Sequence, residues 1–313
     1  MRRLSPSALL ACPFALATLS GCAAGAPDGA GRDAAEGATS AAVVVIERTV
    51  SADETVRGSI VARFLRMRNG AVDDDALRMV GATLDLPAEG TCAPQLGGSD
   101  PGATIASSEP AIPRAVELLD VGAVAIESGE ARTELEARSL PDIVDLVSGV
   151  VYATRSTEPF DARTLPGHGS YQLSMGGSAE LDLPPFSMSA TASGEPDGLH
   201  VDGKDVRAND GIVFTIGANV DVRWDVADDR APDDLVYIDI APSGATSPTG
   251  ATIRCQFADR GSATLPATAF DSGTVSAGTL IVHRVHREMF HVGGIDSGVL
   301  RFDFARAIPF TRR

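Results

Sequence analysis

Residues 220–226 read VDVRWDV, and no other run of the chain indicates its fold class as clearly. Apolar and charged residues alternate strictly along it, which is typical of a β-strand with one buried face and one solvated face. The four apolar side chains, Trp224 among them, are therefore expected to enter a core, while the three charged ones face water. Trp224 is the single tryptophan of the chain, so this strand also predicts where that side chain is buried.

The same alternation appears elsewhere in the chain. Around Cys255, every second residue is apolar, and residues 300–304 read LRFDF, which predicts a buried Leu/Phe face with Arg301 and Asp303 pointing outward. Residues 132–138 also alternate and predict one continuous strand, with a helix as the alternative that their propensities allow. Short alternating runs separated by Gly, Pro, Asp and Ser are the pattern of antiparallel β-structure.

Paired glycines and paired prolines mark the middle of the chain. Residues 171–175 and 179–183 flank a two-residue Gly-Gly link at 176–177, which predicts a tight hairpin because glycine accepts positive φ. Residues 184–185 are both proline. Since proline cannot donate to a sheet ladder, this pair predicts the end of a strand and a domain boundary.

These patterns predict an all-β fold with two antiparallel β-sandwich-like domains, one over residues 43–184 and one over residues 185–313. The second domain resembles the immunoglobulin-like sandwiches of secreted bacterial proteins, with Trp224 as its buried aromatic residue, but it lacks a second cysteine for the immunoglobulin disulfide. Helical periodicity is weak. The aspartates at residues 73–75 predict the cap of a short helix that starts near Ala76.

The composition argues against some classes of partner. Lys and Arg number 26 against 42 Asp and Glu, a net charge of −16 that becomes −18 (24 − 42) once the two arginines of residues 1–21 are removed. Phosphate backbones repel such a surface, so nucleic acid is not an expected partner. Aromatic residues make up only 5% of the chain, which argues against surfaces that bind bases or sugars by stacking.

Residues 1–21 have the pattern of an export signal. Two arginines at the start precede an apolar core at residues 9–19, and eleven residues are too few to cross a hydrocarbon layer of roughly 30 Å as a helix. The core ends in Leu19-Ser20-Gly21-Cys22. This motif resembles the lipobox of bacterial lipoproteins, in which the cysteine is acylated and becomes the new N-terminus.

The lipobox resemblance implies acyl chains such as palmitate on Cys22, which would hold the protein on a membrane. Inner-membrane lipoproteins commonly carry an aspartate directly after the cysteine, so Ala23 at that position implies the outer membrane in a cell that has one. Residues 22–42 are small and polar, which predicts a disordered linker between anchor and body. The alternative is an ordinary secretory signal, cleaved near Ala24 or Ala26, that leaves no anchor.

Three segments of the body are similar to uncharacterised lipoproteins of Gram-negative bacteria. They are residues 116–128 (VELLDVGAVAIES), 144–154 (VDLVSGVVYAT) and 255–270 (CQFADRGSATLPATAF). The resemblance implies a β-fold and a location in the cell envelope. No activity is established for that group, so it implies no mechanism.

Two of the four cysteines are available for a disulfide bond. Cys12 leaves with the signal and Cys22 takes the lipid, so Cys92 and Cys255 remain, 163 positions apart (255 − 92). In an oxidising compartment such a pair predicts a disulfide that joins the two predicted domains. The alternative is a free Cys255 buried on an apolar strand face, with Cys92 unpaired in a loop. The pair lacks the spacing of a zinc site.

The sequence contains two clusters of potential metal ligands. His283 and His286 would point to opposite faces of a strand, so with His291 they are expected to be exposed polar residues rather than zinc ligands. Five aspartates crowd the loop after the Trp224 strand, and clustered carboxylates are the ligands that calcium prefers. These weak calcium candidates are Asp225, Asp228, Asp229, Asp233 and Asp234. Their spacing fits no EF-hand loop, the alternative is a solvated turn, and no cofactor is expected.

Catalytic motifs are absent from the sequence. It contains no G-x-S-x-G elbow and no S-x-x-K ending at Lys204, its only lysine. The sequence therefore favours a non-enzymatic, membrane-anchored envelope protein with a structural role or with other envelope proteins or small ligands as partners. The rival hypothesis is an envelope hydrolase with an active site built from the loops at residues 91–113 or 225–234.

Overall fold

The structure is a computed structural model, and it describes residues 39–67, 70–95, 116–143, 147–154, 164–206, 211–228, 230–243, 252–270 and 277–313. Within these segments nineteen strands accompany one six-residue α-helix and one short 3₁₀ turn, which confirms the all-β prediction. No helix in these segments is long and apolar enough to cross a bilayer. The predicted signal, Cys22 and the linker up to residue 38 lie outside the described residues, and the first strand already begins at Ser40.

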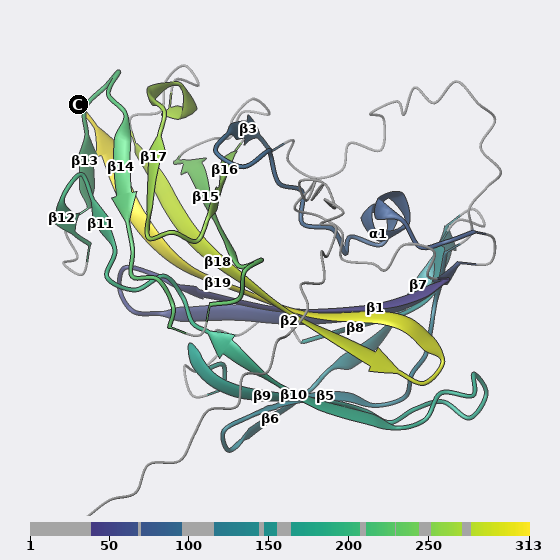
Figure 1. Cartoon of the computed structure of the whole chain (residues 1–313). Coiled ribbons are helices and arrows are strands. Elements are labelled where there is room, and N and C mark those ends of the chain that lie inside the picture. The colour runs from purple at the N-terminus through teal and green to yellow at the C-terminus, as the bar shows by residue number, and fades with distance from the viewer. Residues whose placement is uncertain are drawn as a thin grey trace, which may run out of the picture.

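The largest sheet has eleven strands and runs through the whole body (Figure 1). They are β1 (Ser40–Val50), β2 (Val56–Met67), β3 (Cys92–Pro94), β4 (Val116–Leu118), β7 (Glu136–Ile143), β8 (Val147–Ala153), β13 (Ile212–Phe214), β15 (Leu235–Pro242), β16 (Ile253–Ala258), β18 (Ala277–Val292) and β19 (Ile295–Arg312). Their order is β3-β16-β15-β18-β19-β1-β2-β4-β8-β7, and β13 pairs with the end of β19. The first and last strands, β1 and β19, are parallel neighbours over ten residue pairs.

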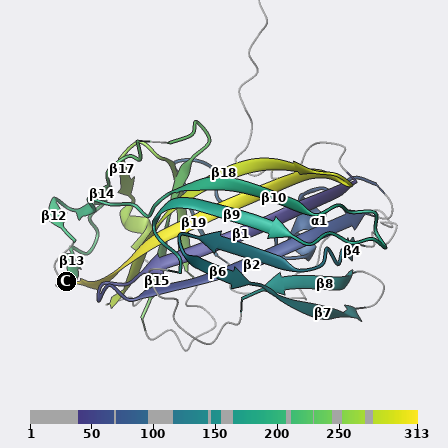
Figure 2. The same ribbon diagram turned by 90° about the horizontal axis from the view of Figure 1, so that it is seen from below.

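Two four-stranded antiparallel sheets lie against this long sheet (Figures 1 and 2). The first small sheet, in the order β10-β9-β5-β6, consists of β5 (Val124–Ser128), β6 (Ala131–Glu134), β9 (His168–Met175) and β10 (Phe186–Ser193). The second small sheet, in the order β12-β11-β14-β17, consists of β11 (His200–Val201), β12 (Lys204–Asp205), β14 (Val220–Arg223) and β17 (Ser262–Leu265). The helix is α1 (Asp74–Met79), and the 3₁₀ turn is η1 (Ala267–Phe270).

Both small sheets cover the same face of the long sheet, and β19 shows how. Its residues Leu300, Phe302 and Phe304 enter a first core, under the first small sheet. Ile308 and Phe310 follow at the same two-residue spacing and enter a second core, under the second small sheet. Because alternate residues of a strand share a face, one sheet supplies part of each core.

Trp224 lies in the second core, as its alternating run predicts. The side chain is 4% exposed, and the indole N–H donates to Oδ1 of Asp259 at 2.6 Å. The strand itself is shorter than the run, because β14 ends at Arg223. Val226, three residues beyond that end, is exposed rather than buried.

The opposite face of the long sheet is also covered. α1 and the segment after it pack there, with Leu77 fully buried in a third core. Asp73 caps this helix by accepting a hydrogen bond from the backbone N–H of Ala76 at 2.9 Å, which confirms the predicted cap. Since this face is covered, Arg301 and Asp303 are each only 5% exposed, and the prediction that they point outward to water is wrong.

The predicted tight hairpin at residues 176–177 is wrong. β9 pairs with β10 over eight residues and not with residues 179–183. Gly177, at φ 78°, instead lies in the ten-residue connection of residues 176–185, within which Ser178 and Leu183 form an isolated bridge. The boundary predicted between residues 184 and 185 falls within this connection, whereas the chain passes from the first small sheet to the second between β10 and β11.

The single strand predicted over residues 132–138 is two strands in different sheets. β6 belongs to the first small sheet and β7 to the long sheet, and Leu135 between them is buried in the first core. Strands that switch sheets keep their alternation through the bend. The sequence pattern therefore does not reveal the change of sheet.

Cys92 and Cys255 form a disulfide bond, with the two sulfur atoms 2.04 Å apart. Cys92 lies on the edge strand β3 and not in a loop, directly opposite Cys255 on β16. Cys255 is fully buried in the second core, while Cys92 packs against it half-buried. The bond thus ties the segment that carries α1 to the long sheet.

Replacing both cysteines with alanine should lower the free energy of unfolding by about 2–4 kcal/mol, because the bond closes a long loop and restricts the unfolded chain. Urea unfolding without reductant measures the change. Reduced wild-type protein should behave like the double variant. A wild-type midpoint that reductant leaves in place would contradict the prediction.

Candidate functional site

Three arginines interrupt the apolar face of the long sheet where the two cores meet. Arg48 on β1 and Arg284 on β18 lie on either side of Phe304 of β19, and Arg306 is the next residue of β19 on that face. We refer to Arg48, Arg284 and Arg306 as the arginine seam. Burying a charge without partners costs several kcal/mol, so each guanidinium in this position needs acceptors from the covering segments.

Arg48 is held by a buried carboxylate. Its Nη1 donates to Oε2 of Glu195 at 2.6 Å, and its Nε donates to the carbonyl oxygen of Leu165 at 2.7 Å. The side chains of Arg48 and Glu195 are 7% and 10% exposed. A charge-assisted hydrogen bond of this length in a dry surrounding fixes β1 to the segment that carries Glu195.

Arg284 makes the most extensive contacts of the three. Its Nε donates to Oδ2 of Asp259 at 2.9 Å, and its two Nη atoms donate to the carbonyl oxygens of Glu195 and Asp225 at 3.3 and 2.5 Å. The other carboxylate oxygen of Asp259 accepts the Trp224 indole N–H. With side chains 3% and 0% exposed, Arg284 and Asp259 form a buried pair on which three segments converge.

The crossing segment, residues 194–199, runs from the first small sheet to the second and meets the seam. Its backbone is tied to the end of β14, because the N–H of Asp225 donates to the carbonyl oxygen of Asp197 at 2.8 Å. Gly198 has φ 59°, and a Cβ there would clash with the carboxylate of Asp225. Only glycine permits both the left-handed backbone and this close approach.

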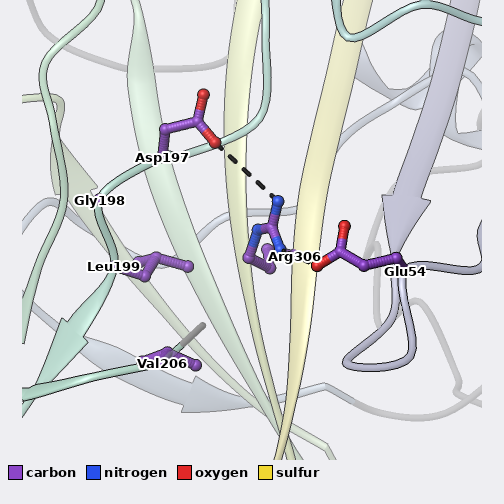
Figure 3. A pocket seen from close by; sticks show the side chains of 6 residues that line it. All are labelled: Glu54, Asp197, Gly198, Leu199, Val206 and Arg306. Atoms are coloured by element: carbon purple, nitrogen blue, oxygen red, sulfur yellow. Dashed lines mark hydrogen bonds and ion pairs between the residues drawn. The ribbon is translucent and has the colours of Figure 1, made fainter. Parts of the chain in front are cut away.

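A pocket opens beside Arg306, between the crossing segment and the turn that joins β1 to β2 (Figure 3). Its volume is about 260 Å³, and it is lined by Glu54, Asp197, Gly198, Leu199, Val206 and Arg306. Asp197, Leu199 and Val206 lie on one side of Arg306 and Glu54 on the other. Leu199 is buried and Val206 packs against the second core, so part of the wall is apolar.

The Arg306 guanidinium is surrounded by three carboxylates. Its Nη1 donates to Oε1 of Glu54 at 3.1 Å, while its Nη2 lies 3.9 Å from both Oε1 of Glu195 and Oδ1 of Asp197. Those two longer distances exceed hydrogen-bond length, so they are ion pairs only. Glu54 adopts φ 61°, an uncommon backbone for a non-glycine residue, where it meets Arg306.

His283 and His286 are not the exposed polar residues that the sequence predicted, although they do lie on opposite faces of β18. His286 is 7% exposed, and its Nδ1 lies 2.7 Å from Oδ1 of the buried Asp234. The hydrogen bond to Asp234 raises the pKa of His286, against the opposing effect of burial, with a further contribution from Glu288. His291 alone of the three is exposed.

This pKa shift predicts a pH dependence of stability. A histidine whose pKa is raised on folding stabilises the folded state fully below its usual pKa of 6.5, and the contribution is lost as pH rises through the folded-state value. The urea midpoint of the wild type should therefore fall as pH increases above 6.5. His286→Gln should remove this slope and His291→Gln, the matched exposed control, should keep it; an unchanged slope in His286→Gln would refute the assignment.

His283 is part of a second buried network, on the face covered by α1. Its Nδ1 lies 2.8 Å from Oδ1 of Asp303, whose Oδ2 accepts the Tyr237 hydroxyl at 2.6 Å. Burial by itself raises the pKa of Asp303, but His283 and Tyr237 together hold that pKa below its usual value. Nε2 of His283 is buried and makes no hydrogen bond among the described residues. Among the described residues, no hydroxyl or thiol is hydrogen-bonded to this nitrogen of the Asp–His pair.

Among the described residues, the proposed calcium ligands are not brought together. Asp234 is buried and bound to His286, Asp225 is directed at Gly198, and Asp228 and Asp233 are exposed. Asp229 lies outside the described residues. Among the described residues no three His, Cys, Asp or Glu side chains come close enough to hold a metal ion. Of the other candidate loop, residues 92–94 form β3, and residues 96–113 lie outside the description.

Comparison with known proteins identifies neither a family nor a function for this chain. No protein-family model matches the chain, and no curated protein matches it. Among solved structures, the chain is similar to the Fcho1 Mu homology domain of Danio rerio with bound Eps15 peptide, at 12% identity and a TM-score of 0.23. The alignment covers 89% of this chain and 98% of that one. A TM-score this low carries no argument about fold or function.

Sequence reasoning missed the arginine seam and the pocket. Arg48 interrupts an apolar run, VVVIERTV at residues 43–50, at a position that shares the parity of the buried residues. Arg284 stands likewise between the valines of IVHRVH. A charged residue at a core-facing position was the available signal, but its acid partners lie far away in the sequence and carry no signature of their own.

Proposed function

We propose that the chain is a lipid-anchored envelope protein whose β-body binds a partner or a small ligand and catalyses no reaction. The observation that carries the proposal is Leu19-Ser20-Gly21-Cys22 after a short apolar core, because two or three acyl chains on one cysteine suffice for stable membrane attachment. The body supports a binding role through its pocket, whose charged residues come from three separate segments.

Cys22→Ala tests the anchor, with Cys12→Ala as the matched control in the same signal segment. Wild type and Cys12→Ala should incorporate radioactive palmitate and stay with membranes through an alkaline wash. Cys22→Ala should lose the label and appear in the wash. Label or membrane attachment that survives Cys22→Ala would refute the anchor.

The proposed membrane is the outer one, on the strength of Ala23 after the cysteine. Density-gradient separation of envelopes should place the wild type in the outer-membrane fraction. Ala23→Asp should move it to the inner-membrane fraction, whereas Ala23→Ser should leave it in place. Equal distribution of all three proteins would contradict this placement.

A further inference from the structure

The pocket beside Arg306 has an uncompensated negative charge. Among its six lining residues, Glu54 and Asp197 are acidic and Arg306 is basic, a sum of −1. Glu195, just behind them, is already paired with Arg48 at 2.6 Å. The side chains of Glu54 and Asp197 are 69% and 51% exposed, so both are accessible from solvent.

Asp197 in particular has spare capacity to accept hydrogen bonds. Its Oδ1 lies 3.9 Å from Arg306, and its Oδ2 lies 3.5 Å from Nε2 of His168, at the limit of hydrogen bonding. A carboxylate offers about four acceptor positions. A donor in the pocket could therefore bond to Asp197 without displacing a strong contact.

The position of Asp197 is fixed by the fold. Its carbonyl oxygen accepts from Asp225, and the next residue is the glycine that the Asp225 carboxylate requires. Directly beyond lies Leu199, 3% exposed, whose carbonyl oxygen accepts from the N–H of Val206 at 3.0 Å. The acidic side of the pocket thus continues into an apolar wall on a hydrogen-bonded backbone (Figure 3).

From this arrangement we infer that the pocket binds a primary ammonium group on an aliphatic stem. The ammonium would donate to Asp197 and Glu54, which offset its charge, and the stem would lie against Leu199 and Val206. A free carboxylate is disfavoured, because three acidic side chains surround the one guanidinium that could receive it. The chemistry suits a lysine side chain of a partner protein as well as a small free diamine.

This inference deepens the proposed binding role and is independent of the anchor. The test uses the full chain as its host produces it, purified in a nonionic detergent and titrated by calorimetry. The probes are 1,5-diaminopentane and Nα-acetyl-lysine amide, with pentanoate and 1-pentanol as anionic and neutral counterparts. Only the two amines should bind, with dissociation constants on the order of 1 mM, weakening as salt rises. Tighter binding of the lysine derivative would indicate that the natural ligand is a lysine side chain of a protein. Tighter binding of the diamine would indicate a free amine.

Variants give the sharper test. Asp197→Asn should weaken amine binding about tenfold, a loss of about 1.4 kcal/mol, while Asp228→Asn, an exposed aspartate outside the pocket, should change nothing. Arg306→Gln should strengthen amine binding, because it removes the competing cation. If Arg306→Gln does not fold, the Asp197→Asn result alone tests the inference.

Preferential binding of pentanoate, or an amine affinity unaltered by Asp197→Asn, would overturn the inference. So would the absence of amine binding at tens of millimolar. Each of these results can occur with Cys22 still lipidated, so failure of the pocket assignment and failure of the anchor are distinguishable.

Discussion

Replacing Arg284 with methionine should lower the free energy of unfolding by about 3–5 kcal/mol, the usual cost of leaving a buried charge without its partner. Asp259, whose side chain is fully buried, would keep the Trp224 indole as a donor but lose its cation. The carbonyl oxygens of Glu195 and Asp225 would lose a donor as well. The crossing segment, the β16–β17 turn and the end of β14 would all be loosened by one substitution.

Arg260→Met is the matched control for Arg284→Met. The Arg260 side chain is 77% exposed and lies 3.8 Å from Glu89, so its loss should change stability by less than about 0.5 kcal/mol. Urea unfolding followed by circular dichroism measures both variants. A free energy of unfolding for Arg284→Met within 1 kcal/mol of the wild-type value would contradict the prediction, because the seam would then not hold the covering segments to the long sheet.

Phe302→Ala should cost about 3–5 kcal/mol, the range found when a large aromatic side chain is removed from a packed core. Phe302 is 1% exposed, and its ring centroid lies 5.2 Å from that of Tyr171 and 5.7 Å from that of Phe304. Phe302→Leu keeps most of the volume and should cost much less.

The same variant tests whether the two cores unfold together. Phe302 belongs to the first core, whereas Trp224, the only tryptophan, belongs to the second. Because β19 serves both cores, the midpoint seen by Trp224 fluorescence should shift together with the midpoint seen by circular dichroism. A Trp224 transition that stays in place would show that the cores unfold independently.

Local pattern predicted local structure well in this chain. Strict alternation identified the strands around Trp224, Cys255 and Phe302, and the run of aspartates identified the cap of α1. These predictions succeeded because the two-residue alternation of side chains along a strand and the capping of a helix both depend on residues close together in the sequence.

The contacts between distant segments could not be predicted. Alternation indicates on which face of its strand a residue lies, but it does not indicate which segment covers that face. Arg301 and Asp303 alternate like solvated residues, yet the segment after α1 covers them from more than 200 positions away, where Arg301 donates to the carbonyl oxygen of Ala82. The hairpin at residues 176–177 failed for the same reason: a glycine pair permits a turn but does not select the strand that pairs with β9. The pocket arises only where three such distant segments meet.

The parallel pairing of β1 with β19 sets the order of events when the protein is made. Of the described strands, β19 is synthesised last, yet it lies beside β1 in the middle of the long sheet rather than at an edge. A nascent chain that still lacks its final residues has neither the centre of the sheet nor the β19 side of either core, and contacts so distant in sequence form slowly. The long sheet and both cores can therefore be completed only after β19 has been synthesised, so folding of the body follows translation of its strands rather than accompanying it.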